Sequence, residues 1–257
     1  MNAIIISDLH IGSRYFQFGM FERFLENFPT DYELIMNGDI IDSHYAKMEK
    51  SDQRALDMIE KISYHQKVIW VRGNHDNGYV PQHFGQTIFK SSHRIGKRLL
   101  ITHGDDFDEI MPRSRLFIKA FRLMHNLRVK MGARPVHVAE YAKKWKSFYR
   151  VLRKNIAANA VQSAAENGFE AVTCGHTHYP EDIRLNGIRY INTGAWTEVP
   201  AHYLQITAEG MVLNQVDSSF VSHRLASDPL NPISTVPFTD AVPQPTEASP
   251  DYRNFAP

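Results

Sequence analysis

The chain of 257 residues, with 43% hydrophobic and 22% charged residues, has the composition of a globular protein with a substantial core. Its formal net charge of +1 gives the whole chain no electrostatic bias toward nucleic acid. Cys174 is the only cysteine, which excludes an internal disulfide and a cysteine-based zinc site and favours a reducing compartment. The first six residues lack the basic region of a signal peptide and are typical of a strand, so we expect a cytoplasmic protein.

The first part of the chain alternates short apolar runs with helical periodicity. Two amphipathic helices are predicted, one over residues 16–28, where phenylalanines recur at helical spacing, and one over 51–64 with Ser51 as its N-cap. Four strands are predicted at the apolar runs, over residues 3–7, 33–36, 68–71 and 97–102. This alternation indicates βαβ units and a layered α/β fold.

A helical insertion is predicted over residues 112–167, where strand signals vanish. Between Arg113 and Lys154 there are thirteen basic residues and one acidic residue, Glu140, interleaved with large apolar side chains. This pattern is typical of an element that faces lipid or an anionic membrane surface. Two alternatives stay open: a solvated charged face over an ordinary core, and a nucleic-acid patch, which we do not expect because the rest of the surface would then be acidic.

The chain after the insertion returns to strands and then changes in composition. Glu209 and Gly210 are predicted to form a hairpin turn. Further strands are predicted over residues 169–174, 188–191, 203–207 and 211–216. Seven of the thirteen prolines lie beyond residue 222. We therefore expect a domain over residues 1–222 and an extended or disordered tail over 223–257.

Side chains that bind metals follow five of the predicted strands. They are carboxylates, imidazoles and one amide: Asp8, His10, Asp39, Asn74, His75, His103, His176 and His178. Oxygen and imidazole donors without thiolate suit manganese, iron(II) or zinc. These eight groups are too many for one closed tetrahedral site. They suit two divalent metal ions that share a bridging carboxylate.

The order of these residues resembles the motif set of the calcineurin-like metallophosphoesterases, over residues 8 to 178. The matching segments are Asp8-Leu9-His10, Gly38-Asp39, Gly73-Asn74-His75-Asp76, His103-Gly104-Asp105 and Gly175-His176-Thr177-His178. The resemblance implies a four-layer α/β/β/α sandwich with a dinuclear site at the strand ends. Manganese is the expected metal, with iron and zinc as alternatives.

The same resemblance implies a role for each residue. His75 would contact the phosphoryl group as a proton donor or transition-state stabiliser, and Asp76 would orient His75 by accepting its other N–H or would cap the following turn. Two cations would activate a bridging water, and the resulting hydroxide would attack the phosphorus in line. One ion would be held by Asp8, His10, Asp39 and His178, and the other by Asp39, Asn74, His103 and His176.

Within this superfamily, protein serine/threonine phosphatases are disfavoured because no Asp-Arg-Gly follows Asp39. The string from His103 to Asp108, the insertion, and Asn192-Thr193-Gly194-Ala195-Trp196 resemble the UDP-2,3-diacylglucosamine pyrophosphohydrolases of lipid A synthesis. That resemblance implies a nucleotide-linked lipid or nucleotide-sugar substrate, and an enzyme peripheral at the inner membrane through residues 113–154. His75 departs from the arginine of the best-known members.

Two further carboxylates and two other functions complete the predictions. Asp105 and Asp108 are candidates for contact with a sugar or nucleotide hydroxyl, with a surface location as the alternative. Besides pyrophosphate hydrolysis, a broad-specificity phosphodiesterase or nuclease stays open, as does a non-catalytic protein that binds the membrane surface.

Overall fold

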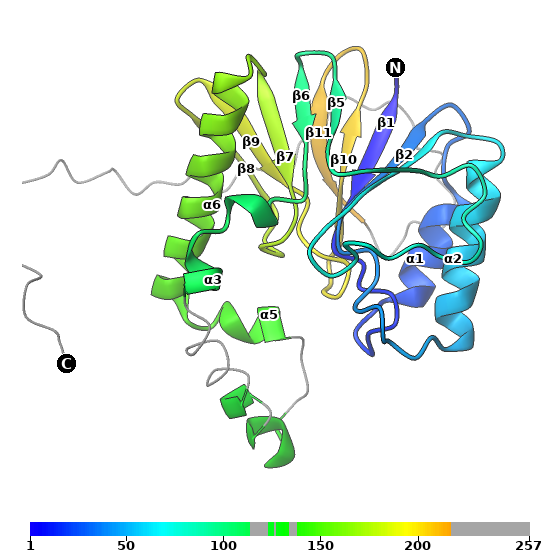
Figure 1. Cartoon of the computed structure of the whole chain (residues 1–257), viewed down its shortest axis with the longest axis vertical. Coiled ribbons are helices and arrows are strands. Elements are labelled where there is room, and N and C mark those ends of the chain that lie inside the picture. The colour runs from blue at the N-terminus through cyan, green and yellow to red at the C-terminus, as the bar shows by residue number, and fades with distance from the viewer. Residues whose placement is uncertain (114–122, 126, 134–137, 217–257) are drawn as a thin grey trace, which may run out of the picture.

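The computed structural model describes residues 1–113, 123–125, 127–133 and 138–216. In this part of the chain two β-sheets lie face to face, and helices cover their outer faces (Figure 1). The predicted four-layer α/β/β/α sandwich is confirmed. The predicted tail over 223–257 lies outside the described residues, as do residues 114–122, 126 and 134–137 of the predicted insertion.

The first sheet contains the two predicted N-terminal strands at its centre. Its strand order is β11 (Met211–Gln215), β10 (His202–Ile206), β1 (Ala3–Ile6), β2 (Glu33–Asn37), β3 (Val68–Val71) and β4 (Ile88–Lys90). Strands β1 to β4 pair in parallel, with Ile5 opposite Ile35 and Ile35 opposite Ile69. Strand β10 returns antiparallel to β1. The parallel strands therefore present their carboxyl ends at one edge.

Alternation of side chains along these strands builds two separate cores. In β1, Ile4 and Ile6 pack toward helices α1 (Phe18–Glu26) and α2 (Lys50–Ser63), whereas Ile5 packs toward the second sheet. Both faces of the strand are buried, which is why these segments are continuous apolar runs in the sequence.

The second sheet carries the remaining motif strands. Its strand order is β5 (His93–Ile95), β6 (Leu99–Ile101), β7 (Ala171–Cys174), β9 (Ile188–Asn192) and β8 (Glu181–Leu185). Strands β6, β7 and β9 are parallel. Helix α6 (Lys146–Glu166) covers the outer face by packing Ala160 and Val161 with Val172 and Tyr190. The last part of the predicted insertion thus has an ordinary buried face, with Lys146 and other basic residues exposed.

Short helices connect β6 to α6. The 3₁₀ helix η1 (Asp105–Phe107) and α3 (Ile110–Arg113) lie beside α6, whereas α5 (Val138–Ala142) lies below the sheets (Figure 1). None of the helices in the described part of the chain is both long and apolar enough to cross a membrane.

The start of α2 differs from the prediction. Glu49, not Ser51, is the N-cap residue, and it forms a capping box in which its backbone N–H donates to Asp52 Oδ2 at 2.8 Å. In the reciprocal bond, the Glu49 side chain accepts the backbone N–H of Asp52, which satisfies a second backbone donor. The helix therefore begins at Lys50, one residue before Ser51. Strands β4, β5 and β8 were not predicted, because they are short or polar edge elements whose side chains are largely exposed or half-buried.

Candidate metal centre

The predicted metal ligands converge at one end of the sandwich. Asp8 and His10 follow β1 and Asp39 follows β2, both in the first sheet, whereas His103 follows β6 in the second. His176 and His178 follow β7, also in the second sheet. All of these side chains are buried except His176, which is half-buried. The site is therefore assembled from both sheets.

Among the described residues, three overlapping groups of side chains could each hold a metal ion. The groups are Asp8, His10 and His178; His10, Asp39 and His75; and Asp39, His103 and His176, and within each group the ligand atoms lie within 4.8 Å of one another. Asp39 and His10 are shared between groups. The geometry thus supports the prediction that Asp39 can serve two adjacent ions, the arrangement of dinuclear centres.

Several buried imidazole nitrogens in the cluster face one another or a carboxylate. Nε2 of His10 lies 3.2 Å from Nε2 of His178, so two imidazole nitrogens face each other. Nε2 of His103 is fully buried and lies 3.1 Å from Asp39 Oδ2. A cation would satisfy such atoms, and the mixture of imidazole and carboxylate donors suits manganese, iron or zinc. The residues present therefore fit a divalent metal ion.

The electrostatics of Asp39 and His103 lead to the same conclusion. Burial by itself would lower the pKa of His103, but the carboxylates of Asp39 and Asp8 raise that pKa well above its usual range. Burial would raise the pKa of Asp39, but His103 and neighbouring histidines lower it well below its usual range. A metal ion bound here would replace the imidazole proton, so metal binding is coupled to proton release.

The backbone at the ligands adopts an uncommon conformation. Asp8, His10, Asp39, His176 and His178 have φ angles of 55°, 50°, 53°, 62° and 55°, and in the described residues Asn186 is the only other non-glycine residue with positive φ. Such conformations cost roughly 1–3 kcal/mol each and persist only when the surroundings fix them. Here the backbone N–H groups of Asp8 and His10 donate to the carbonyls of Gly38 and Asp39.

Two glycines of the motifs are required by close approach of the chain. A Cβ atom at Gly73 would lie 2.3 Å from Asp39 Oδ1, and one at Gly175 would lie 2.2 Å from Asp8 Oδ2. Neither carboxylate can move away without leaving the cluster. These glycines therefore allow neighbouring strand ends to meet at the ligands.

His75 lies half-buried at the edge of the cluster. Its backbone N–H donates to Asp39 Oδ1 at 2.9 Å, and its ring meets that of His10 edge-on with centroids 4.8 Å apart. Asn74 is exposed, and its predicted role as a ligand stays a prediction. His75 therefore lies beside Asp39 and His10, and its contact with a phosphoryl group stays a prediction.

The predicted role of Asp76 as the partner of the His75 ring is wrong. Its Oδ1 accepts the N–H of Gly73 at 2.6 Å, and its Oδ2 accepts those of Ile40 and of the Trp70 indole at 2.8 and 2.9 Å. Two segments and a core indole thus converge on one buried carboxylate. Asp76 fixes the backbone that carries His75 rather than its imidazole.

The sequence analysis missed Asp42, which takes the place assigned to Asp76. Its backbone carbonyl lies 2.6 Å from Nδ1 of His75, and its carboxylate Oδ1 lies 3.2 Å from Nδ1 of His10. A carboxylate behind a ligand histidine fixes the ring and raises its basicity. The feature of the sequence that could have indicated Asp42 is its place as the second aspartate in Gly38-Asp39-Ile40-Ile41-Asp42.

Of the two predicted substrate carboxylates, Asp108 has protein partners. Its Oδ2 lies 3.0 Å from Nε2 of His176, and its Oδ1 accepts the N–H groups of Ile110 and Met111 at the start of α3. Asp108 is also buried, which excludes the alternative of a surface carboxylate. It supports His176 in this structure, whereas contact of the partly exposed Asp105 with a substrate stays a prediction.

The Asn192-to-Trp196 segment supports the ligand loops from behind. The Asn192 side chain donates to the carbonyl of Gly175 at 2.6 Å, and the backbone N–H of Trp196 donates to the carbonyl of Asp8 at 3.0 Å. Trp196 itself is fully buried against Phe21 and Phe24. The segment thus connects the ligand backbone to the first core.

The sequence model of the calcineurin-like phosphoesterase family matches residues 1–180, which include every residue of the cluster. The chain belongs to the calcineurin-like phosphoesterase family. It is therefore a hydrolase, and the clustered aspartates and histidines are the candidate ligands for the divalent metals of this metallophosphoesterase fold.

Solved structures of phosphoesterases are similar to this family member. The phosphoesterase Yfce from E. coli shares 16% identity over 84% of this chain and 94% of its own, with a TM-score of 0.46. An archaeal phosphodiesterase shares 16% sequence identity over 84% of this chain and 99% of its own, with a TM-score of 0.42. Nuclease MPE from Pseudomonas putida shares 15% sequence identity over 81% of this chain and 85% of its own, with a TM-score of 0.40. A sequence comparison with curated proteins found no match.

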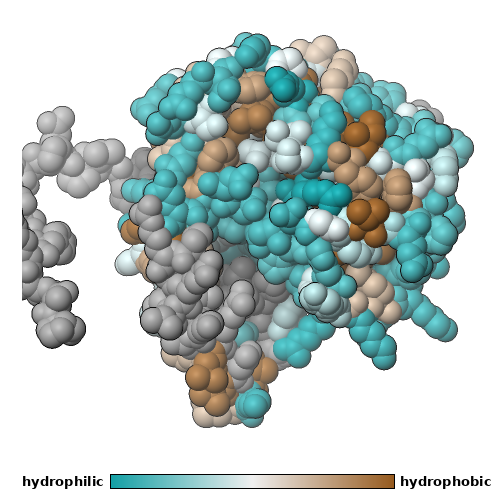
Figure 2. Space-filling model, in the orientation of Figure 1, coloured by the Kyte–Doolittle hydropathy of each residue, from teal (hydrophilic) through white to brown (hydrophobic). Residues whose placement is uncertain are grey.

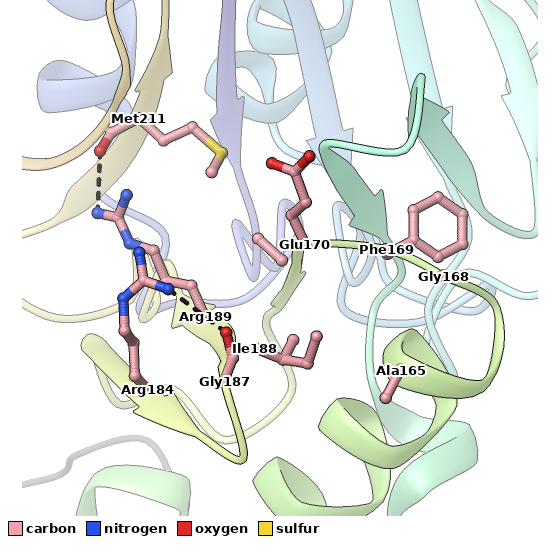
Figure 3. A pocket seen from close by; sticks show the side chains of 10 residues that line it. Ala165, Gly168, Phe169, Glu170, Arg184, Gly187, Ile188, Arg189 and Met211 are labelled. Atoms are coloured by element: carbon pink, nitrogen blue, oxygen red, sulfur yellow. Dashed lines mark hydrogen bonds between the residues drawn. The ribbon is translucent and has the colours of Figure 1, made fainter.

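A cavity of about 540 Å³ lies at the opposite end of the second sheet (Figure 3). Ala171, at the start of β7, lines it together with Ile188 and the two arginines Arg184 and Arg189. Arg189 is already paired with Asp182 at 2.7 Å. None of the metal-ligand candidates lines this cavity, so it is separate from the phosphoesterase centre.

Proposed function

We propose that this phosphoesterase cleaves the pyrophosphate bond of UDP-2,3-diacylglucosamine or a similar nucleotide-linked lipid. Two divalent ions are proposed, with manganese as the expected metal and iron or zinc as alternatives. The observation that carries the reaction class is the sharing of Asp39 between two ligand groups. The proposed place of action is the inner membrane surface.

The residues of the chain have distinct parts in this reaction. When bound, the two ions would neutralise phosphate oxygens and activate water for in-line attack. Asp39, which belongs to two candidate ligand groups, would hold both ions. His75, with Nδ1 hydrogen-bonded to the Asp42 carbonyl, has Nε2 left to donate to a phosphate oxygen when the ring is protonated. A protein nucleophile is not required for this attack, and Cys174 is fully buried.

An apolar face on the insertion supports a lipid substrate. Leu123, Leu127 and Met131 recur at a spacing of four, and their side chains are 61%, 49% and 82% exposed. Figure 2 shows hydrophobic surface at the lower end of the molecule, where this segment projects in Figure 1. Cations such as Lys130 lie along the same segment. Apolar and cationic groups together suit acyl chains beside a diphosphate or an anionic membrane.

Contacts with α5 hold this segment in place. The ring of His125, which is buried, lies 4.9 Å from the ring of Tyr141, and the Arg128 guanidinium lies 4.7 Å above that ring. Arg128 is therefore engaged in cation–π contact, and the apolar face is left toward the exterior.

The test compares substrates on one metal-loaded preparation. Protein stripped with EDTA and reloaded with Mn²⁺ is expected to release UMP from UDP-2,3-diacylglucosamine. Hydrolysis only of small soluble diesters, such as bis(p-nitrophenyl) phosphate, would contradict the lipid assignment. Two results would instead support the nuclease alternative: hydrolysis of DNA, and a DNA-binding constant whose logarithm falls linearly with the logarithm of the salt concentration.

Paired variants test the apolar face. Met131→Ser is expected to lower kcat/KM for the lipid substrate roughly tenfold, on the scale of one buried large apolar side chain, without changing hydrolysis of the soluble diester. Val212→Ser, which changes an exposed apolar residue on β11, is the matched control. Equal effects of the two variants on the lipid substrate would contradict the use of this face.

A further inference from the structure

The loop between β7 and β8 carries two ligand histidines, and a lysine outside the motif set binds it. Nζ of Lys143, which follows α5, donates to the carbonyl of His178 at 2.5 Å. The same ammonium donates to both carboxylate oxygens of Glu198, at 2.9 and 2.7 Å. Lys143 therefore connects the backbone of a ligand to the segment that follows Trp196.

Helix α6 holds the same loop on both sides of His178. The Tyr149 hydroxyl donates to the carbonyl of Thr177. The Arg153 guanidinium lies 3.4 Å above the Tyr179 ring and pairs with Glu181 at 2.5 Å. Residues from the predicted insertion thus contact the loop from Thr177 to Glu181.

These contacts stabilise an uncommon backbone conformation at His178. His178 has a φ of 55°, a conformation that costs free energy unless neighbouring groups fix it. Its carbonyl accepts from a charged donor, and such bonds are about twice as strong as neutral ones. Lys143 is 21% exposed and Glu198 is 19% exposed, so water screens this contact only in part.

We propose that Lys143 is a positioning residue for the metal ligand His178, acting through the carbonyl of that residue. The inference depends on the metal centre of the proposed function. It assigns Lys143, one of the thirteen basic residues between Arg113 and Lys154, to the architecture of the centre rather than to a substrate phosphate or a membrane.

Titration of the metal-free protein with Mn²⁺ alone tests this role. Lys143→Met is expected to raise the Kd for Mn²⁺ roughly tenfold, at the lower end of the effects of residues behind metal ligands. It should also change the electron paramagnetic resonance spectrum of bound Mn²⁺. Lys143→Arg is expected to restore affinity to within about threefold, because it keeps a charged donor. Lys146→Met removes an exposed lysine nearby and is the matched control, with unchanged Kd expected.

The possible outcomes separate this inference from the proposed function. Wild-type affinity in Lys143→Met, or an equal loss in Lys146→Met, would overturn the positioning role. Failure of the wild-type protein to bind Mn²⁺ would overturn the proposed metal centre itself. Thermal unfolding in EDTA establishes that the variants are folded. If Lys143→Met is not folded, Lys143→Gln keeps a donor for the carbonyl but removes the charge: a Kd for Mn²⁺ above the wild-type value supports the positioning role, and a wild-type Kd overturns it.

Discussion

The carboxylate of Asp42 lies 3.2 Å from Nδ1 of His10, on the side of the ring away from His178. His10 is therefore held between a carboxylate and the ligand cluster. This arrangement fixes which nitrogen faces the metal position, because a hydrogen bond from Nδ1 leaves Nε2 as the ligand atom.

Asp42→Ala is expected to weaken metal binding. Loss of the carboxylate frees the His10 ring and lowers its basicity, and such changes typically reduce metal affinity or activity by roughly 10–100-fold. Mn²⁺ titration of the metal-free variant measures the effect. Asp106→Ala removes an exposed carboxylate and serves as the control. Identical Kd values for the two variants would mean that Asp42 does not support His10.

Gly73→Ala is expected to disrupt the centre, because the added Cβ would lie 2.3 Å from Asp39 Oδ1. The clash should cost about 1–3 kcal/mol of unfolding free energy, as overpacking usually does, and should displace a shared ligand. At Gly210 a Cβ meets no atom within 4 Å, so Gly210→Ala is the matched control. Urea unfolding and Mn²⁺ titration measure the two effects, and wild-type values for Gly73→Ala would contradict the close approach.

Trp196→Ala is expected to lower stability by about 3–5 kcal/mol, the usual loss for truncation of a fully buried aromatic side chain. The indole packs edge-on to Phe24 with centroids 4.9 Å apart, and its N–H donates to the carbonyl of His202. Tyr45→Ala, at a side chain 96% exposed, should change stability by less than about 0.5 kcal/mol. Urea denaturation in EDTA separates this effect from metal binding.

Cys174 should resist thiol reagents in the folded protein. Its side chain is fully buried, and burial raises the pKa of the thiol well above its ordinary value, so little thiolate exists at about pH 8. Labelling with a disulfide reagent should be slow in buffer and complete in urea. Rapid stoichiometric labelling of the native protein would show that β7 opens readily.

The gathering of the aspartates and histidines can be predicted because each of them follows a strand that is largely buried. The strands before Asp8 and His103 are apolar at every position, and the strand before Asp39 is apolar over residues 34–36, which marks where each apolar run ends. Once the strands are parallel, their carboxyl ends must meet at one edge. The fold class and the convergence of the ligands follow from these local signals.

The partners of individual polar atoms could not be predicted in the same way. Asp42 and Asp76 are both aspartates at strand ends, and nothing local indicates which accepts from a histidine and which from backbone N–H groups. Their roles depend on how β2 and β3 lie beside each other. Likewise, the 3-residue strand β5 has no periodicity to reveal it.

Because loops from both sheets form the centre, metal binding is coupled to the packing of the two sheets against each other. Asp8 and Asp39 follow strands of the first sheet, whereas His103 and His178 follow strands of the second, and Ile5 and Ile191 lie in the core between the sheets. A bound ion therefore acts as a non-covalent cross-link across that core. Because the separated sheets cannot form the site, metal stabilises the docked sandwich by RT ln(1 + [M]/Kd). Any loosening between the sheets must weaken metal binding to the same extent, even where no ligand is altered.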